Sequence, residues 1–284
     1  LTGDLYCVGG FDPRFNIDDM NAFVESIRRM GVDTIRGSIV ADRSMKDADL
    51  LGEGWCWDDD NPPLSPLTIG RNTQFVDRFI RQLVDDGVVL DVRVSDGTLP
   101  DSAFHLCSRF HSIDQILLRM MKQSDNFYAE AMFYQLAAHQ GHRPARAKDA
   151  AAIVKRLISK VGLGHRPYRI ADGSGLSLYN YLSADLEVRL LRYAYRNSTV
   201  YLHLLPSLPV AGSDGTLRNR MRGSFAADNV KAKTGTLEGV SALAGYCTAA
   251  NDHRLCFSII NQGVMHTSNA RRFQDRVCNA LCAP

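Results

Sequence analysis

The last third of the chain carries the pattern that most restricts its fold, because three short apolar stretches follow one another with tight turns between them. The segment NVKAKTGTLEGVSALAGYCTAANDHRLCFSIINQG, residues 229–263, predicts three antiparallel strands. The segment TSNARRFQDRVCNALC, residues 267–282, then predicts a closing helix. We therefore expect an antiparallel sheet flanked by helices.

The first hundred residues show helix and strand patterns in alternation. Helical periodicity marks NIDDMNAFVESIRRMG (16–31) and TQFVDRFIRQLVDDG (73–87). The stretches DTIRGSIVAD (33–42) and VVLDVRV (88–94) follow them and predict strands. Between these pairs, GEGWCWDDDNPPLSP (52–66) has the composition of a loop. This part of the chain therefore predicts a mixed α/β module.

From about residue 105 the pattern changes to longer helices. The stretch FHSIDQILLRMMKQ (110–123) carries one apolar stripe, formed by Ile113, Ile116, Leu117, Met120 and Met121. The stripe stops at Ser124, where a new helix is predicted, capped by Ser or Asp and carrying Tyr128, Met132 and Leu136 at every fourth position. A third helix is predicted in AKDAAAIVKRLISKVGLG (147–164).

The composition limits the classes to which the protein can belong. With 284 residues and 45% hydrophobic content, the chain can bury a full core, and its formal net charge is only +2. The densest basic stretch, LRNRMRG (217–223), is too short to indicate nucleic-acid binding. The sequence has no apolar run of about 20 residues. It also has no HExxH, P-loop or dinucleotide motif, so neither a metal nor a nucleotide cofactor is expected.

The cysteines leave the redox compartment ambiguous. There are seven, with no CxxC or Cys/His ligand spacing, which argues against a zinc site and against a complete disulfide framework. If TAANDHR forms a turn centred on Asn251 and Asp252, Cys247 and Cys256 face each other across a strand pair. Such pairs are more often two buried thiols than a disulfide. For Cys278 and Cys282, four residues apart on the closing helix, simple packing is expected.

Two short motifs suggest chemistry when they are taken together. Ser124-Asp125-Asn126 lies at a predicted helix junction, and Lys233-Thr234-Gly235 lies on a predicted strand about a hundred residues later. Each triplet alone is weak evidence, since the first is an ordinary helix cap in most proteins. Their order and structural contexts are those of the second and third motifs of penicillin-recognising serine enzymes.

The chain as a whole resembles the D-alanyl-D-alanine carboxypeptidase/endopeptidase family, the class C low-molecular-mass penicillin-binding proteins. The resemblance covers nearly the whole chain. Besides the two triplets it rests on four segments in the family's order: GDLYCVGGFDP (3–13), GWCWDDD (54–60), DGSGLS (172–177) and LPVAGSDGTLRNR (208–220). It implies a penicillin-binding-protein/β-lactamase-like transpeptidase fold of the α/β (α+β) type. The expected domains are a partial inserted α/β module at residues 1–104 and a penicillin-binding domain at 105–284.

The resemblance also implies roles for residues of the predicted strand. Lys233 would place positive charge beside Ser124 and help to bind the carboxylate of the substrate. The hydroxyl groups of Thr234 and Thr236 would donate hydrogen bonds to that carboxylate. The N–H of Thr236 would be one donor of the oxyanion hole, and Gly235 would leave room for the approaching peptide.

The same resemblance implies functions for the residues at the helix junction. Ser124 would relay a proton toward the leaving amine, and Asn126 would hold the substrate amide and the catalytic lysine. Asp125 is expected to point away into the structure. For Asp172 and Ser174 of the DGSGLS segment, a structural role and substrate contact are equally favoured.

One element of the family is missing. Its nucleophile belongs to a Ser-x-x-Lys motif, and no serine here has lysine at the third following position: Ser44 is followed by MKD, Ser159 by KVG and Ser26 by IRR. The family carries this motif upstream of GDLYCVGG, so we expect the N-terminal portion to be missing from these 284 residues. The stretch between GWCWDDD and Ser124 is also shorter than in many members. An insert is therefore expected to be reduced, or a further piece to be missing around LTIGRNTQF (67–75).

The predicted function is that of a serine-type DD-peptidase that hydrolyses the D-Ala-D-Ala bond, or the cross-link, of peptidoglycan stem peptides through an acyl-enzyme. β-Lactams would inhibit it, and it would act in the periplasm or elsewhere outside the cytoplasm of a bacterium. The alternatives are a catalytically incomplete peptidoglycan-binding protein that uses the same groove, and a hydrolase of another substrate such as an ester. The sequence does not distinguish carboxypeptidase from endopeptidase cleavage, and it leaves the oligomeric state open.

Overall fold

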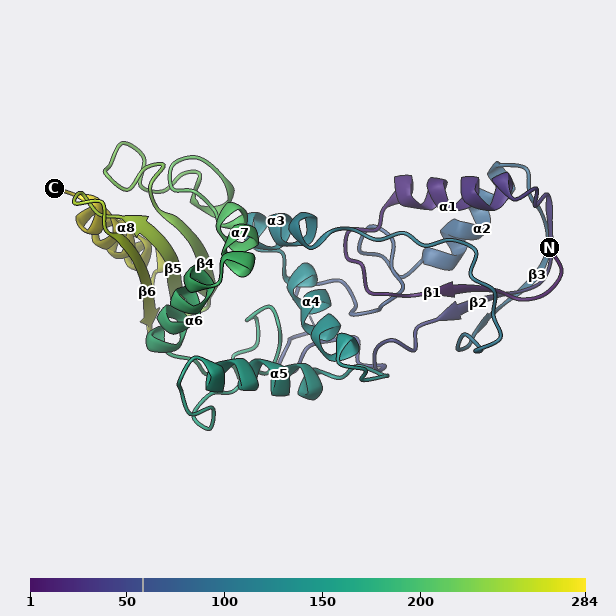
Figure 1. Cartoon of the computed structure of the whole chain (residues 1–284), viewed down its shortest axis with the longest axis horizontal. Helices are drawn as coiled ribbons and strands as arrows, with labels where there is room; N and C mark the ends of the chain where they lie inside the picture. Colours follow the sequence, from purple (N-terminus) through teal and green to yellow (C-terminus); the bar gives the residue numbers. More distant parts are fainter. Residues whose placement is uncertain (58) are drawn as a thin grey trace. The chain divides into compact units, whose positions relative to one another are not determined.

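The structure, a computed structural model, describes residues 1–57 and 59–284, so Asp58 of the GWCWDDD segment lies outside the described residues. The chain forms two compact units (Figure 1). The first comprises Leu1–Ser112 and Phe127–Ala151, and the second comprises Ile113–Asn126 and Ala152–Pro284. Residues 127–151 thus group with the first unit. The division into an inserted module (1–104) and a penicillin-binding domain (105–284) concerns the organisation of the family and stays a prediction.

The first unit contains a parallel sheet of three strands. The strands are β1 (Leu5–Val8), β2 (Thr34–Asp42) and β3 (Val89–Asp96), with β2 in the middle. Helix α1 (Ile17–Arg29) connects β1 to β2, and α2 (Phe75–Asp85) lies between β2 and β3. Parallel neighbours need such crossover connections, so the alternating pattern of the sequence is explained.

Helix α1 begins where the sequence predicts a start. The Asn16 side chain accepts a hydrogen bond from the Asp18 N–H, and the Asp19 carboxylate accepts one from the Asn16 N–H. The apolar face of the helix then buries Met20 and Val24 against the sheet, together with residues of α2. The periodicity of this segment therefore reflects its packing.

Helix α4 (Asn126–His139) buries only part of the fourfold spacing seen in the sequence. Phe127, Ala131 and Tyr134 are buried, and Tyr128 of the predicted stripe is buried with them. Leu136, however, is exposed. The predicted helix is present, but apolar residues occur on several of its sides, so the spacing alone does not select the buried side.

The second unit contains the antiparallel sheet that the sequence predicts. Its strands β4 (Lys231–Leu237), β5 (Val240–Thr248) and β6 (Arg254–Gln262) lie in chain order, so β4 and β6 are the edges. Helices α6 (Ala184–Arg196) and α7 (Ser198–Ser207) precede the sheet, and α8 (Thr267–Cys282) closes the chain. The predicted α/β fold with helices flanking an antiparallel sheet is confirmed.

Helices cover the two faces of this sheet (Figure 1). On one face, Gln274 of α8 donates a hydrogen bond to the Ser241 carbonyl at 3.1 Å. On the other face, the Tyr246 hydroxyl donates to the carbonyl of Leu191 in α6 at 2.7 Å. Lys231 lies directly opposite Tyr246 on β5, so the two side chains are on the same face of the sheet. Because side chains alternate along a strand, Lys233 lies on that face too.

Two further helices complete the part of the fold that matters for the site. Helix α3 (Ile113–Gln123) packs against α7 and the short helical turn η1 (Gly215–Leu217), whereas α5 (Ala147–Lys160) begins in the first unit and ends in the second. The predicted stripe of α3 is only partly buried, with Ile116 inside and Ile113 exposed. Leu117, Met120 and Met121 are half-buried, so the apolar stripe is only partly inside the core.

The cysteine pair predicted across the last hairpin is wrong by one residue. Cys247 lies opposite Leu255, and Cys256 lies opposite Tyr246, so the two thiols are on different faces of the sheet. The turn spans an odd number of residues and is centred on Asn251, with Ala249 donating to the carbonyl of His253. A shift of one residue in register exchanges the faces.

The packing predicted for the closing helix is confirmed. Cys278 and Cys282 are both buried in the hydrophobic core that also contains Cys247. Among the described residues, no helix has the length and apolar character needed to cross a membrane.

Candidate active site

Two of the predicted site residues meet in the second unit, although 109 positions separate them in the sequence. The ammonium group of Lys233 on β4 donates a hydrogen bond to Ser124 Oγ at 2.7 Å and another to the carbonyl of Thr234. Ser124 is exposed, and Lys233 is partly buried. The contact therefore places a lysine and an accessible hydroxyl side by side.

Ser124 occupies a special position in the backbone. It lies between the end of α3 and the first residue of α4, and its φ of 55° is in the left-handed region that non-glycine residues seldom adopt. The next residue, Asp125, is buried and accepts a hydrogen bond from Arg119 Nε at 2.9 Å. Asp125 thus points into the structure, as predicted, and its ion pair holds the junction.

The surroundings of Lys233 change its proton affinity. Burial of the ammonium group lowers the pKa of Lys233 from 10.5 to about 8. At neutral pH the group is still mainly charged, but a modest rise in pH is enough to neutralise it. A lysine of this kind can supply positive charge and can also exchange a proton near physiological pH.

The outer edge of β4 presents hydrogen-bond donors. The N–H of Ala232 donates to the carbonyl of Pro209 on the side of the strand away from β5. Because alternate N–H groups of a strand point the same way, those of Thr234 and Thr236 point from this edge too. Gly235 is exposed, so an extended peptide can approach the strand here.

A loop before η1 fastens the end of α3 to β4. The ammonium group of Lys122 donates to the Leu208 carbonyl and to the carboxylate of Asp214, each at 2.6 Å. Burial alone would raise the pKa of Asp214, but the hydrogen bonds from Lys122 and from the Val210 N–H, with the lysine charge, lower it below 3.8. Lys122 precedes Ser124 by two residues, so this ion pair fixes the junction that carries the serine.

The same loop reaches β4 itself. Gly215 has a φ of 54°, and a Cβ atom there would lie 2.7 Å from the backbone carbonyl of Lys122, so only glycine fits. The next residue, Thr216, accepts a hydrogen bond from the Thr234 hydroxyl at 2.9 Å. The segment LPVAGSDGTLRNR therefore holds the two halves of the site together.

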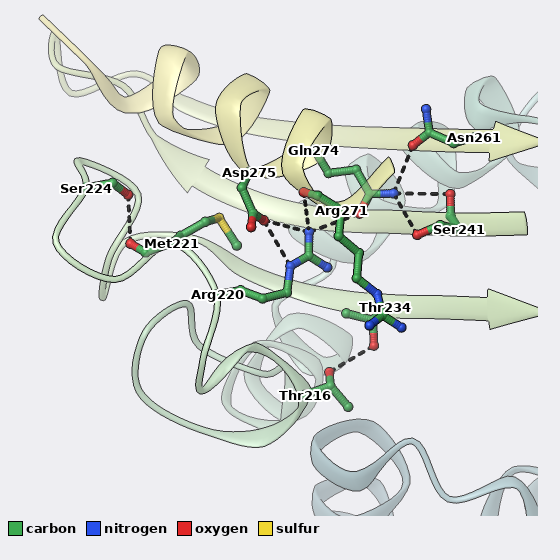
Figure 2. A network of polar contacts seen from close by, with 10 residues as sticks. All are labelled: Thr216, Arg220, Met221, Ser224, Thr234, Ser241, Asn261, Arg271, Gln274 and Asp275. Carbon is green, nitrogen blue, oxygen red and sulfur yellow. Dashed lines mark hydrogen bonds and ion pairs between the residues drawn. The ribbon is translucent and has the colours of Figure 1, made fainter. Parts of the chain in front are cut away.

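A polar network joins this loop to α8 and the sheet (Figure 2). Arg220 donates to Asp275 at 2.6 Å and to Gln274 at 3.0 Å. Gln274 is fully buried and reaches Ser241 on β5. Arg271, also on α8, donates to the Thr236 hydroxyl at 3.3 Å. The network braces the strand that carries Thr234 and Thr236 from the side opposite to Lys233.

The DGSGLS segment is held by one carboxylate. Buried Asp172 accepts hydrogen bonds from the N–H groups of Gly175 and Ser177, and from the side-chain amide of Asn180 at 2.7 Å. These contacts give Asp172 a structural role in shaping its own loop.

The structure thus brings together some of the predicted residues and adds others. Ser124 and Lys233 are in contact, and Thr234, Gly235 and Thr236 follow on the same strand; Asn126 lies two residues after Ser124, at the start of α4. Sequence reasoning missed Lys122, Asp214 and Thr216. Among the described residues, no group of three or more His, Cys, Asp or Glu side chains is placed to hold a metal ion.

A helix-flanked antiparallel sheet whose edge strand carries Lys-Thr-Gly next to Ser-Asp-Asn defines a penicillin-recognising protein. The sequence profile of the D-Ala-D-Ala carboxypeptidase 3 (S13) family matches residues 1–77 and 70–281, so the chain belongs to that family. The two matches overlap at the stretch where the sequence predicts a missing or reduced piece.

Known relatives agree with this assignment. D-alanyl-D-alanine carboxypeptidase DacB of Haemophilus influenzae is 34% identical over 189 residues, covering 65% of this chain and 38% of the relative. A D-alanyl-D-alanine carboxypeptidase of Actinomadura sp. is 28% identical over 359 residues, covering 92% of this chain and 66% of the relative. The chain therefore spans between about a third and two thirds of the length of these relatives.

Solved structures show the same fold. Penicillin-binding protein 4 of Haemophilus influenzae matches with a TM-score of 0.88 and 22% identity, covering 99% of this chain and 82% of that one. A second structure of that protein, complexed with a β-lactam, matches with a TM-score of 0.81 and 23% identity, covering 100% and 82% of the two chains.

Proposed function

We propose that this protein is a serine-type D-Ala-D-Ala peptidase that acts on the stem peptides of peptidoglycan outside the cytoplasm and is acylated by β-lactams. Membership of the S13 family supports the substrate class, and the β-lactam complex of a structural relative supports the inhibitor class. The observation that carries the proposal is the 2.7 Å contact between Lys233 and Ser124 beside the open edge of β4.

Each site residue has a physical role in the proposed reaction. The peptide lies along the outer edge of β4, where Gly235 leaves room and the Thr236 N–H donates to the scissile carbonyl oxygen as negative charge develops on it. Lys233, Thr234 and Thr236 bind the terminal carboxylate. Asn126 binds the substrate amide.

The chemistry is acyl transfer in two steps. A serine hydroxyl loses its proton to a base and attacks the carbonyl carbon between the two D-alanines. The C–N bond then breaks, and the leaving amine takes a proton through Ser124. A water molecule hydrolyses the resulting ester, which releases the shortened peptide and regenerates the serine. The 284 residues contain no Ser-x-x-Lys motif, so the attacking serine is a requirement that these residues do not themselves supply.

A second function remains open because of that missing motif. A protein with the same groove but without the nucleophile would bind peptidoglycan peptides and would not cleave them. The intact edge of β4 is compatible with both functions, because binding needs the same N–H groups as catalysis. Only a covalent adduct distinguishes the two.

Intact mass spectrometry of the purified protein, before and after incubation with benzylpenicillin, tests the proposal. In a protein that supplies the attacking serine, one penicilloyl adduct is expected, together with release of D-alanine from a D-Ala-D-Ala peptide. Lys233→Ala should abolish both reactions. Lys231→Ala, on the same strand and the same face, is the matched control and should keep them.

The outcomes separate the two functions. A mass equal to that of the 284 residues, with no adduct but with saturable peptide binding, would establish the binding protein and refute the enzyme. Full acylation of the Lys233→Ala variant would show that the proposed site is not the site of reaction.

A further inference from the structure

A second concave site lies in the same unit as the candidate active site but shares none of its residues. A cavity of about 710 Å³ lies between helices α6 and α7 and the β5–β6 end of the sheet. This volume is within the range of small-molecule sites in proteins. Neither Ser124 nor Lys233 is among its lining residues.

Aromatic side chains give this cavity a firm wall. Tyr201 lies edge-on to Tyr195 and to Tyr246, with ring centroids 5.2 Å and 5.3 Å apart. The Tyr246 hydroxyl is held by the Leu191 carbonyl of α6, so the ring does not turn freely. The wall therefore presents preformed ring surfaces to an occupant.

The charge of the lining is unlike that of the chain as a whole. The chain has 33 basic and 31 acidic residues, whereas the cavity is lined by four cations and one carboxylate, that of Asp228. The cations are Arg192, Arg196, Lys231 and Arg254. Within the described part of the chain, no ion pair joins any of the four to a carboxylate. Such a cluster attracts an anion.

Two of these cations lie side by side on one helix. Arg192 and Arg196 are four residues apart on α6 and therefore share a face, where their like charges repel each other unless an anion lies between them. Two guanidinium groups in this arrangement suit a phosphate, which accepts several hydrogen bonds from their planar forks.

The positive surface continues beyond the cavity. A smaller cavity of about 390 Å³ also includes Arg192 and Arg196 and adds Lys160 and Arg189. Arg189 is neutralised by Asp185 at 2.9 Å, while Lys160 lies over the ring of Tyr193 at 5.2 Å. A ligand held at the two shared arginines has room to extend in this direction.

We propose that the larger cavity binds a sugar phosphate, either free or at the end of a longer glycan. The phosphate lies between Arg192 and Arg196, and the sugar ring lies against Tyr201 and Tyr246. Asp228 accepts hydrogen bonds from the sugar hydroxyls. Tyrosine rings with nearby polar groups suit a sugar, because a sugar ring has apolar C–H faces and also carries hydroxyl groups. This binding is independent of peptidase activity.

Isothermal titration calorimetry of the full chain with glucose 6-phosphate, inorganic phosphate and glucose tests the proposal. Saturable binding is expected for glucose 6-phosphate, with binding about tenfold weaker or more for phosphate and none measurable for glucose. A singly phosphorylated maltodextrin should bind as tightly as glucose 6-phosphate if the natural ligand is a free sugar phosphate. It should bind more tightly than glucose 6-phosphate if the natural ligand is the phosphorylated end of a glycan. Absence of saturable binding by both phosphorylated sugars overturns the proposal, as does equal affinity for inorganic phosphate and glucose 6-phosphate.

Variants locate the binding. Arg192→Gln with Arg196→Gln should weaken it about tenfold or more, and Lys231→Gln, on the sheet side of the cavity, should weaken it as well. The matched control is Arg272→Gln with Arg276→Gln on α8, which removes the same charge from the opposite face of the sheet and should leave the affinity unchanged. An equal loss in the control would show attraction to net charge alone and refute the site. Circular dichroism melting confirms that each variant is folded.

Discussion

The lowered proton affinity of Lys233 makes the stability of the second unit depend on pH in a direction that can be calculated. The pKa of Lys233 falls from 10.5 to about 8 because its ammonium group is buried. Above 10.5 the group is neutral in both the folded and the unfolded state. Between about 10.5 and 8 the unfolded chain takes up a proton that the folded protein does not, so this contribution to stability is fully present above 10.5 and is lost as the pH falls toward 8.

The size of the effect follows from the two values. Each pKa unit corresponds to about 1.4 kcal/mol, so the wild type should gain about 2.5 kcal/mol of unfolding free energy from Lys233 between pH 7 and pH 10. Lys233→Met removes the titrating group. The difference in unfolding free energy, wild type minus variant, should therefore rise by about this amount over the same range.

Urea unfolding followed by near-ultraviolet circular dichroism, at several pH values from 7 to 10, measures this difference. Thr236→Val is a non-titrating control on the same strand, and its difference from the wild type should stay constant with pH. A difference for Lys233→Met that is flat, or that falls as the pH rises, would refute burial as the cause of the lowered pKa.

Three further predictions concern the loop that holds the site and the cysteines. Gly215→Ala places a Cβ atom 2.7 Å from the Lys122 carbonyl at a φ of 54°, so it should destabilise the protein by about 1 to 3 kcal/mol; an unchanged melting temperature would contradict this close approach. Asp214→Asn removes the charge partner of Lys122. Its penalty, about 1 kcal/mol or less at this half-exposed pair, should be present above pH 3.8 and shrink as the pH falls through the lowered folded pKa, which a series of urea denaturation curves from pH 7 downward would show. Burial raises the pKa of Cys247 to about 12, so iodoacetamide at pH 8 should label exposed Cys56 first and Cys247 only after unfolding, as peptide mass spectrometry can verify.

Much of the fold could be predicted from the sequence because its signals are local. Helix α1 follows from its capping residues and its apolar period, and the strands β4 to β6 follow from their alternation and turns. The error in the last hairpin shows the limit of such signals. Nothing in TAANDHR determines whether the turn is centred on Asn251 or between Asn251 and Asp252. This choice nevertheless decides the face of the sheet on which each cysteine lies.

The candidate site shows the same limit. The triplets at Ser124 and Lys233 carry recognisable chemistry, so the sequence pointed to them directly. Lys122 carries no such signal, and although Asp214 and Thr216 lie in a segment that resembles the family, nothing in the sequence assigned either residue a role. Their importance lies in contacts over long sequence separations, such as the 92 positions between Lys122 and Asp214.

The sequence by itself thus determined the elements of this protein, its family resemblance and the residue types that its chemistry requires, because helical period, strand alternation and turn composition act over a few residues. The tertiary structure alone decided that Lys233 reaches Ser124 across 109 positions, that burial lowers the pKa of that lysine, and that four cations gather around one cavity. Charge, burial and contact are properties of neighbours in space, and the order of residues along the chain does not specify those neighbours until the chain has folded.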